Sequence, residues 1–372
     1  MLEERWLTCI KECTLYGASD IFFQTDCPVY AKFNGQLSMV TKDPVSKGEM
    51  EKVILDLYSA PEVGSKSSDI TKYNTCGDDD FSLVIPDVAR FRVNAFHQRN
   101  APGAVLRVVP FGIPNYKMLN IPETVINLVN YHSGLIIVCG QAGSGKSTTQ
   151  ACMIDAVNQT RAAHIVTIED PIEYFHTNIK SLITQREVPG DAKDFDSALA
   201  AALRQAPDII LVGEMRDYAT IRTAVTAAET GHLVIATLHT QDSISTIDRI
   251  IDIFPAEQQS QIRSQLAATL RAVVAQRMVS CADGKTRPAF EILISNLAVA
   301  TYIREKQTHQ IVSILAGNKN TDSISMDDAL WQMYCDKVIT KEVLLQNCTN
   351  PDTINTKLSN QSSGNQMRRP RF

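Results

Sequence analysis

Residues 134–149 read GLIIVCGQAGSGKSTT, an apolar run followed at once by a loop rich in glycine. The run is short and almost wholly apolar, which predicts a buried strand. The loop matches the pattern G-x-x-x-x-G-K-[ST] from Gly140 to Ser147, directly between that strand and a predicted helix. In this context the pattern holds the phosphates of a nucleoside triphosphate. The stretch therefore predicts an α/β fold of the P-loop class.

The residues of the loop have distinct expected tasks. The glycines let the backbone curl so that successive N–H groups point at phosphate oxygens, and the helix N-terminus adds its partial positive charge. Lys146 is expected to reach the β- and γ-phosphates as a catalytic group, and the Ser147 hydroxyl is expected to hold Mg²⁺. ATP and Mg²⁺ are therefore the expected cofactors. The predicted nucleotide-binding residues of the loop are Gly140, Gln141, Ala142, Gly143, Ser144, Gly145, Lys146, Ser147 and Thr148.

Composition narrows the class of protein. The chain has 372 residues, enough for two domains, with 44% hydrophobic residues, 21% charged residues and a formal net charge of −5. A negative chain lacks the basic field that nucleic-acid binding needs, so no nucleic-acid partner is expected. No window approaches 18 apolar residues, and the N-terminus MLEERWLTCIKEC lacks the layout of a signal peptide, so we expect a cytoplasmic protein. The nine cysteines include no CxxC pair, which favours reduced thiols over a zinc site.

The first 109 residues predict a small α+β domain. Residues 1–16 and 46–60 have the apolar spacing of amphipathic helices. Three stretches separated by turn residues predict strands: GASDIFFQT, PVYAKFNGQL and DFSLVIPDVARFRVNAFHQRN. The segment PFGIPNYK, residues 110–117, has two prolines and a glycine and is the predicted linker.

Residues 118–350 alternate short apolar strands with helices, which predicts a parallel sheet. The predicted strands are GLIIVC, HIVTIE, DIILVGE and HLVIATLH. Ser243 is expected to cap a helix that Pro255 ends. One face of a further long helix is marked by Ile262, Leu266, Leu270, Val273 and Val274. Residues 351–372 are polar without apolar periodicity and are predicted to form a disordered tail.

Three predicted strands carry polar groups suited to hydrolysis. TIEDPIE ends one strand with Glu169, IILVGE places Glu214 after four apolar residues and a glycine, and HLVIATLH runs from His232 to His239. Because the carboxyl ends of parallel strands line one crevice, these groups are expected beside the phosphate loop. We interpret Glu169 as the base for water and Glu214 as a ligand of Mg²⁺ or of its water shell, although the two roles can be exchanged. His232 and His239 are interpreted as γ-phosphate sensors.

These motifs together resemble the secretion ATPase superfamily, and most closely its PilT-like branch, the motors that retract type IV pili. The resemblance covers residues 17–350. GASDIFF resembles the N-terminal signature of the family, RFRVNAFHQR its arginine-bearing strand, GQAGSGKSTT the Walker A loop and TIEDPIEY the Asp box. The stretch ILVGEMRDYATIRTAVTAAETGHLVIATLHT covers the Walker B and His boxes, and RIIDIFPAEQQSQIRSQLAATLRAVVAQR continues in the same order.

The resemblance implies a RecA-like P-loop ATPase core preceded by a PAS-like N-terminal domain. It also implies a ring of six identical subunits that hydrolyses ATP to power pilus retraction, the basis of twitching motility. ATP would lie between the RecA-like domain of one subunit and the N-terminal domain of the next, where Arg90, Arg92 and Arg107 match arginines of the family. Two arginines separated by one residue share a face of a strand and can meet triphosphate charge as an arginine finger does.

The resemblance further implies partners and a place in the cell. The ring would dock on an inner-membrane platform protein at the pilus base, on the cytoplasmic face of the membrane, and a paralogous pilus ATPase is a second implied partner. Phe22 departs from the family, which usually has a histidine there. The alternatives are an assembly ATPase of the same superfamily and a RecA-like nucleic-acid translocase. The missing CxxC pair disfavours the first, and the negative charge disfavours the second.

Overall fold

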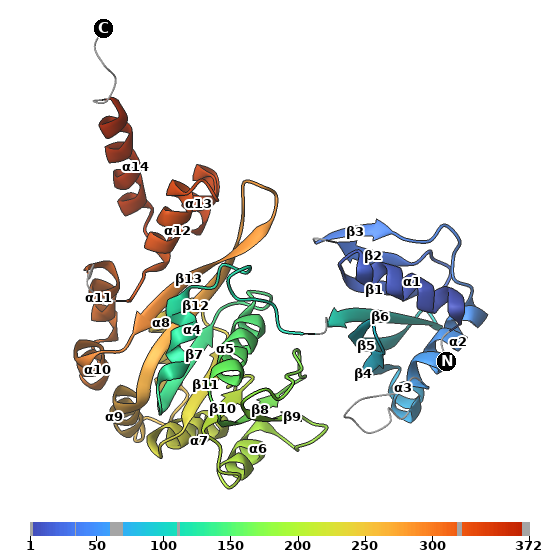
Figure 1. Cartoon of the computed structure of the whole chain (residues 1–372), viewed down its shortest axis with the longest axis horizontal. Helices are drawn as coiled ribbons and strands as arrows, with labels where there is room; N and C mark the ends of the chain where they lie inside the picture. Colours follow the sequence, from blue (N-terminus) through green and yellow to red (C-terminus); the bar gives the residue numbers. More distant parts are fainter. Residues whose placement is uncertain (1–2, 34, 60–69, 110–111, 318–321, 367–372) are drawn as a thin grey trace. The chain divides into compact units, whose positions relative to one another are not determined.

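The computed structural model describes residues 3–33, 35–59, 70–109, 112–317 and 322–366, and it divides into two compact units (Figure 1). The first unit runs to Gly112 and includes the short segment Glu173–Phe175. The second unit comprises the rest of the chain from Ile113. The division falls inside the predicted linker 110–117, of which residues 110 and 111 lie outside the described residues. Ile113 already packs against the core of the second unit.

The first unit contains a six-stranded antiparallel sheet in the order β3-β2-β1-β6-β5-β4. Alternate residues of each strand point to opposite faces, so Phe91 and Val93 are fully buried in the core while Arg90 and Arg92 lie on the other face. The core face packs with Trp6 of the first helix. The strands are β1 (Ala18–Gln24), β2 (Tyr30–Phe33), β3 (Gln36–Met39), β4 (Asp78–Ile85), β5 (Ala89–Gln98) and β6 (Ala101–Val109), and the helices are α1 (Glu4–Leu15), α2 (Lys47–Tyr58) and α3 (Ile70–Cys76).

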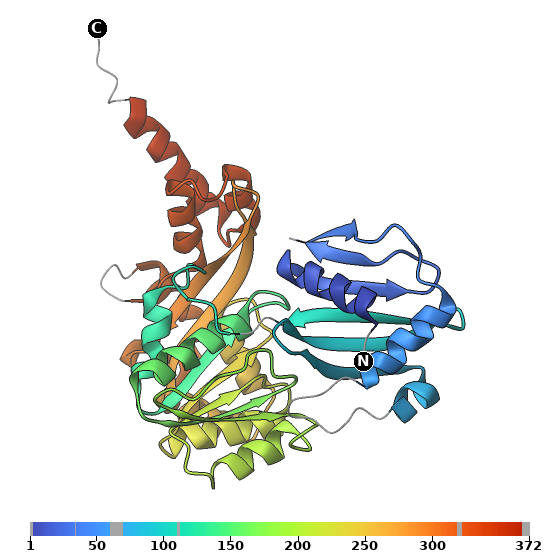
Figure 2. The same cartoon turned by 45° about the vertical axis from the view of Figure 1, so that its right-hand side comes forward.

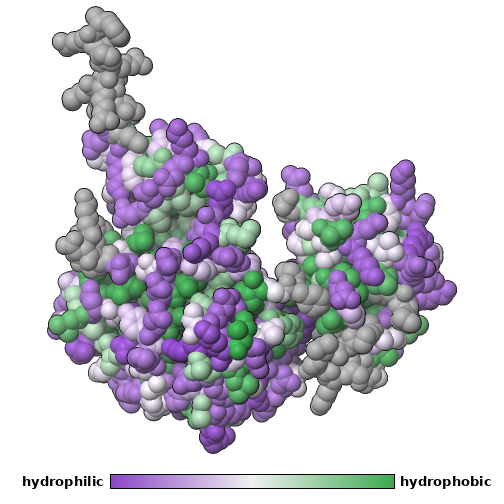
Figure 3. Space-filling view, viewed as in Figure 1, coloured by the Kyte–Doolittle hydropathy of each residue, from purple (hydrophilic) through white to green (hydrophobic). Residues whose placement is uncertain are grey.

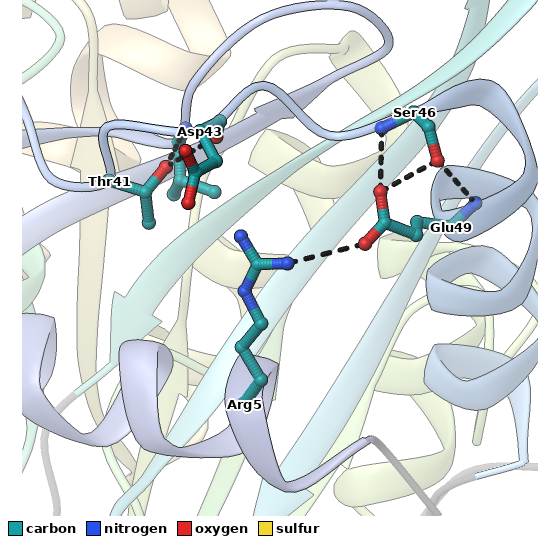
Figure 4. A network of polar contacts seen from close by, with 6 residues as sticks. Arg5, Thr41, Asp43, Ser46 and Glu49 are labelled. Atoms are coloured by element: carbon teal, nitrogen blue, oxygen red, sulfur yellow. Dashed lines mark hydrogen bonds and ion pairs between the residues drawn. The ribbon is translucent and has the colours of Figure 1, made fainter.

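A polar network joins the first two helices (Figure 4). Ser46 caps α2 by accepting a hydrogen bond from the Glu49 N–H, and the Glu49 carboxylate accepts from the Ser46 N–H at 2.8 Å and hydroxyl at 2.6 Å. These bonds lower the pKa of the Glu49 carboxyl, the bond from the Ser46 hydroxyl most of all. Arg5 of α1 lies 3.3 Å from the same carboxylate. The predicted start of this helix at residue 46 therefore corresponds to a capping box.

The second unit is built on a seven-stranded sheet in the order β13-β12-β7-β11-β10-β8-β9. All neighbouring strands are parallel except β12 and β13, as the RecA-like prediction requires for its core. The strands are β7 (Gly134–Cys139), β8 (His164–Glu169), β9 (Leu182–Glu187), β10 (Ile209–Val212), β11 (Leu233–Leu238), β12 (Leu270–Ser280) and β13 (Thr286–Ile294).

Helices cover both faces of this sheet, as Figures 1 and 2 show. One face buries Ile136 and Val138 of β7 against α4 (Glu123–Asn127), η1 (Leu128–Asn130) and α5 (Lys146–Thr160). The other face buries Leu135 and Ile137 against α6 (Phe195–Ala202), α7 (Tyr218–Glu229), α8 (Ser243–Asp252) and α9 (Gln259–Thr269). The remaining helices are α10 (Leu297–Arg304), η2 (Thr308–Gln310), α11 (Ile311–Gly317), α12 (Met326–Cys335), α13 (Lys341–Asn347) and α14 (Pro351–Gln366).

The prediction of one long helix over residues 262–274 is wrong. Helix α9 ends at Thr269, and Leu270 begins strand β12, which pairs with β7 on one side and β13 on the other. Val273 and Val274 are both fully buried although they point to opposite faces of the sheet. A strand buried on both faces has a continuous apolar run, so its period cannot be told from that of a helix.

Two further predictions about helices need correction. The predicted disordered tail is wrong over residues 351–366, because this segment forms α14, whose Ile354 is fully buried against α12 and α13. Residues 367–372 lie outside the described residues. Helix α8 is capped by Asp242 rather than by Ser243, since the Asp242 carboxylate accepts the Ser245 N–H at 2.7 Å. The β12–β13 hairpin, orange in Figures 1 and 2, extends to these last helices.

The surface mixes hydrophilic and hydrophobic side chains. In Figure 3, purple and green residues alternate over both units. Within the described part of the chain, no helix combines the length and apolar character needed to cross a bilayer. All nine cysteines are free thiols, and burial raises the pKa of the Cys139 thiol, just before the phosphate loop, to about 12. A thiol with so high a pKa stays protonated and unreactive near neutral pH.

Candidate active site

The phosphate loop connects the carboxyl end of β7 to the first turn of α5. Gly145 has φ +87°, a left-handed conformation that side-chain-bearing residues rarely adopt, and α5 begins at the next residue. Gln141, Ala142 and Gly143 are exposed at the tip of the loop, while Ser147 and Thr148 are half-buried in the first turn of the helix. The loop therefore presents backbone N–H groups and a helix N-terminus at one edge of the sheet.

Lys146 is held inside the loop that it belongs to. Its side chain is buried, and its ammonium donates hydrogen bonds to the carbonyl oxygens of Gly140 at 2.9 Å and Gln141 at 3.0 Å. Both acceptors lie at the start of the loop, so the charge is centred over the curve that phosphates occupy in P-loop proteins.

Glu169 occupies the last position of β8. Its carboxylate accepts a hydrogen bond from the Thr167 hydroxyl at 2.7 Å and a longer one from the Gln185 amide at 3.4 Å. Gln185 also accepts from the His176 N–H at 2.9 Å, which ties the loop after Glu169 to β9. Gln185 was not predicted as a site residue, because β9 shows no clear alternation and was not predicted as a strand.

Glu214 and His239 form a second polar group at the same edge. The Glu214 residue is 9% exposed, and its carboxylate lies 2.6 Å from the Arg216 guanidinium and 3.4 Å from the His239 ring. His239 directly follows β11, and its side chain is half-exposed. The imidazole thus reaches from solvent to a nearly buried carboxylate.

Backbone hydrogen bonds connect the ends of these strands. The Gly213 N–H donates to the Ile168 carbonyl at 2.7 Å, and the Met215 N–H donates to the Thr237 carbonyl at 3.0 Å. A side chain at 213 would be crowded, since its Cβ would lie 3.1 Å from the Ile168 carbonyl oxygen and 3.2 Å from the Glu169 Cα. A glycine therefore stands where relatives of the Walker B type often have an acidic residue, and Glu169 and Glu214 come from adjacent strands.

His232 does not join this group. It precedes β11, and its backbone carbonyl accepts from the Gly134 N–H at the start of β7. The phosphate loop follows the other end of β7, and at about 3.3 Å per residue the strand puts His232 roughly 20 Å from it. The interpretation of His232 as a γ-phosphate sensor therefore fails within a single subunit, because sequence proximity to His239 hid the length of the strand between them.

The three predicted arginines share one face of the sheet in the first unit. Arg92 and Arg107 lie directly opposite each other on β5 and β6, and both are exposed. Arg107 donates to the Asp20 carboxylate at 2.9 Å. Arg90 is buried, donates to the Ser82 hydroxyl at 2.8 Å, and lies 4.5 Å from the centre of the Phe175 ring. Phe22 lies on this face too, two residues from Asp20 along β1.

Two cavities flank the phosphate loop within the second unit. One, of about 380 Å³, is lined by the loop tip, Gln241, residues 276–278 and Asn347. The other, of about 520 Å³, lies beside Thr148 and is lined also by residues 118–121 and 285–288. Gln276 and Met278 of β12 line both cavities. Neither residue was predicted to line the site, because the strand that carries them was not predicted.

The oxygen donors at this edge suit Mg²⁺. The Ser147 hydroxyl and the carboxylates of Glu169 and Glu214 are hard ligands of the kind that Mg²⁺ prefers. Among the described residues, no three His, Cys, Asp or Glu side chains gather into a metal site.

A parallel sheet of this strand order, with a phosphate loop after β7 and carboxylates at the ends of β8 and after β10, defines a P-loop ATPase with a RecA-like core. The chain matches the model of the type II/IV secretion system protein family over residues 2–363. It belongs to this family.

The chain is similar to known pilus proteins over most of its length. It is 42% identical over 314 residues to the twitching motility protein of Neisseria gonorrhoeae, covering 82% of this chain and 84% of that protein. It is 39% identical over 326 residues to the type IV pilus retraction ATPase PilT of Pseudomonas aeruginosa, covering 88% of this chain and 93% of that protein. The crystal structure of the pilus retraction motor PilT with bound ADP has 41% identity and a TM-score of 0.85, covering 93% of this chain and 98% of that one.

Replacing Lys146 by alanine should abolish ATP turnover and leave the fold intact. The ammonium supplies charge to the β- and γ-phosphates in the transition state, so its loss should raise the barrier by about 3–5 kcal/mol. The measurement is the steady-state ATPase rate of the purified variant, with circular dichroism as the control for folding. Turnover above a tenth of the wild-type rate, a loss of only ~1.4 kcal/mol, would contradict the assignment.

Proposed function

We propose that this chain is an ATP-driven motor that retracts type IV pili. The observation that carries the proposal is the likeness to the PilT retraction motor over nearly the whole of both chains. The phosphate loop, Glu169, Glu214 and His239 at one sheet edge are the groups that such a motor needs for hydrolysis. An assembly ATPase of the same superfamily is the alternative, because it would use the same site. A nucleic-acid translocase has no support in a chain of net charge −5.

The nucleotide fits the site in one orientation. The triphosphate binds along the loop with Lys146 at the β- and γ-phosphates, and Thr148 meets the end nearer the ribose. The base and ribose then enter the cavity of about 520 Å³ beside Thr148, where Met118, Leu119 and Met278 offer apolar surface. Mg²⁺, when bound, neutralises phosphate charge, and Ser147 would hold it with Glu214 or a water on Glu214.

Glu169 orients and deprotonates the attacking water in this proposal. The Thr167 hydroxyl holds one carboxylate oxygen at 2.7 Å, which fixes the orientation of the carboxylate that would take a proton from water. His239 lies 3.4 Å from the Glu214 carboxylate, so an imidazole that contacts the γ-phosphate would link that phosphate to Glu214.

We propose further that the motor is a ring of six subunits. Arg92 and Arg107 are exposed and opposite each other, a geometry suited to phosphate charge approaching that face of the sheet. These arginines of one subunit would complete the nucleotide site of the next subunit. Such a head-to-tail contact, repeated between subunits, closes into a ring. The ring would act in the cytoplasm on an inner-membrane platform protein at the pilus base, with a second pilus ATPase of the family as a further partner.

Glu169→Gln and Glu214→Gln should both impair hydrolysis by different routes. Loss of the base should trap bound ATP with nearly unchanged affinity, and we expect this for Glu169→Gln. Loss of the metal-side carboxylate should raise the Mg²⁺ concentration needed for turnover, and we expect this for Glu214→Gln. Titration of Mg²⁺ against the ATPase rate in both variants is the measurement. The reverse pattern would exchange the two roles.

Deleting the gene should leave cells with surface pili that do not retract. A retraction motor is dispensable for building the filament, whereas an assembly ATPase is required for it. Twitching zones and electron microscopy of surface pili separate the two cases, and complementation with the Lys146→Ala chain is the matched control, which should stay non-twitching. Cells without surface pili would support the assembly ATPase instead.

Mixing Arg92→Ala and Lys146→Ala subunits should restore ATPase activity that neither variant has alone. An interface that joins the phosphate loop of the Arg92→Ala chain to the arginine of the Lys146→Ala chain contains both intact groups. With random one-to-one mixing, roughly a quarter of the interfaces are of this kind, because each contact is head-to-tail. The rate of the mixture is the measurement, and Arg90→Ala and Arg107→Ala can be mixed in the same way. Hybrid rings verified by mass spectrometry yet inactive would rule out independent sites shared between subunits.

A further inference from the structure

Gln276 lies where strand β12 runs on past the end of β7. Ala275 pairs with Cys139, the last residue of β7, so the next residue along β12 lies beside the start of the phosphate loop. Gln276 is 4% exposed. A neutral amide this deeply buried needs hydrogen-bond partners, since leaving it without them is costly. The hydrogen-bond partners of the Gln276 side chain therefore indicate which part of the site it supports.

The contacts of Gln276 reach both ends of the phosphate loop. Its side-chain carbonyl accepts a hydrogen bond from the Thr149 hydroxyl at 2.8 Å, in the first turn of α5. A Cβ placed on Gly145, the last loop residue before that helix, would lie 2.8 Å from the Gln276 side-chain nitrogen. A Cβ placed on Gly140, the first loop residue, would lie 2.3 Å from the Gln276 backbone carbonyl oxygen. One residue thus packs against both terminal glycines of the loop.

We propose that Gln276 is a positioning residue that holds the phosphate loop in the conformation that binds the triphosphate. The Thr149 bond ties the first turn of α5 to β12, and the close packing at Gly140 and Gly145 limits the path of the loop between them. Gln276 also lines the cavities on both sides of the loop. A loop released from Gln276 would have space to move toward either cavity.

The phosphates that the loop binds restrict which side chains suit position 276. An apolar side chain of the same length fills the space without holding Thr149. A carboxylate of the same shape loses the amide N–H groups and brings negative charge to the triphosphate site. Glutamine is the side chain of that length that holds the loop without adding charge.

The experiment compares Gln276→Met and Gln276→Glu with the wild-type chain, all full-length. We expect Gln276→Met to raise KM for ATP and Kd for ADP about tenfold, with kcat lowered less than threefold, because a misplaced loop weakens ground-state and transition-state binding alike. Gln276→Glu should weaken binding further. The melting temperature without nucleotide should stay within a few degrees of wild type in Gln276→Met, while the increase caused by ADP shrinks.

Gln150→Met is the matched control. Gln150 is another buried amide, 3% exposed, on the same helix as Thr149, and its side-chain nitrogen has no hydrogen-bond partner among the described residues. This variant should bind ADP within about twofold of wild type. An unchanged Kd in Gln276→Met, or an equal loss in Gln150→Met, would overturn the proposal. A lower melting temperature with unchanged affinity would also overturn it, since that result describes packing alone.

Thr149→Val keeps the proposal testable if Gln276→Met does not fold. Valine has nearly the shape of threonine but lacks the hydroxyl that donates to Gln276. Its Kd for ADP should rise about threefold to fivefold, less than in Gln276→Met because the Gln276 side chain still packs at Gly145. An unchanged affinity in Thr149→Val would show that the Thr149–Gln276 hydrogen bond does not contribute to nucleotide binding, and would overturn the proposal.

Discussion

The parallel register of β8, β10 and β11 is the constraint on which the site depends. Ile168 pairs with Val212, and Val212 pairs with Ala236, so Glu169, Glu214 and His239 follow these strands at the same edge. The bonds from the Gly213 and Met215 amides continue the pairing beyond the strands. A shift of one residue would turn Glu169 to the opposite face and separate it from the phosphate loop.

The phosphate loop also depends on a second strand, β12, which lies outside the phosphate-loop motif itself. Strand β12 is parallel to β7 and longer, so its residues after Ala275 lie beside the loop rather than beside a strand. Arg277 of the same strand donates to the Asn347 carbonyl at the end of α13, within the cavity at the loop tip. The nucleotide site is therefore in contact with the last helices of the chain, through residues that no nucleotide-binding motif includes.

Much of the core was predictable because its signals are local. Strands β7, β8, β10 and β11 are short apolar runs next to polar residues. Of the polar residues predicted at one sheet edge, Glu169, Glu214 and His239 follow their strands there, whereas His232 precedes β11 at the opposite edge. The helix predicted over residues 262–274 failed because a strand buried on both faces loses its period of two. The polar segment from 351 was predicted as disordered because few apolar residues, among them Ile354, anchor α14. Gln276 was not predicted as a site residue, because its place beside the phosphate loop comes from the pairing of β12 with β7.

By itself the sequence determined the P-loop class, the strands that carry the acidic residues, and the family. These follow from local spacing: the pattern G-x-x-x-x-G-K-[ST] directly between a strand and a helix is specific for a loop that holds nucleotide phosphates. Only the tertiary structure decided which polar residues meet. Pairing with β7 puts Gln276 beneath the loop, 127 residues from its partner Thr149, and the length of β11 puts His232 at the far edge. Such contacts depend on strand order and register, and neither can be read directly from local sequence patterns.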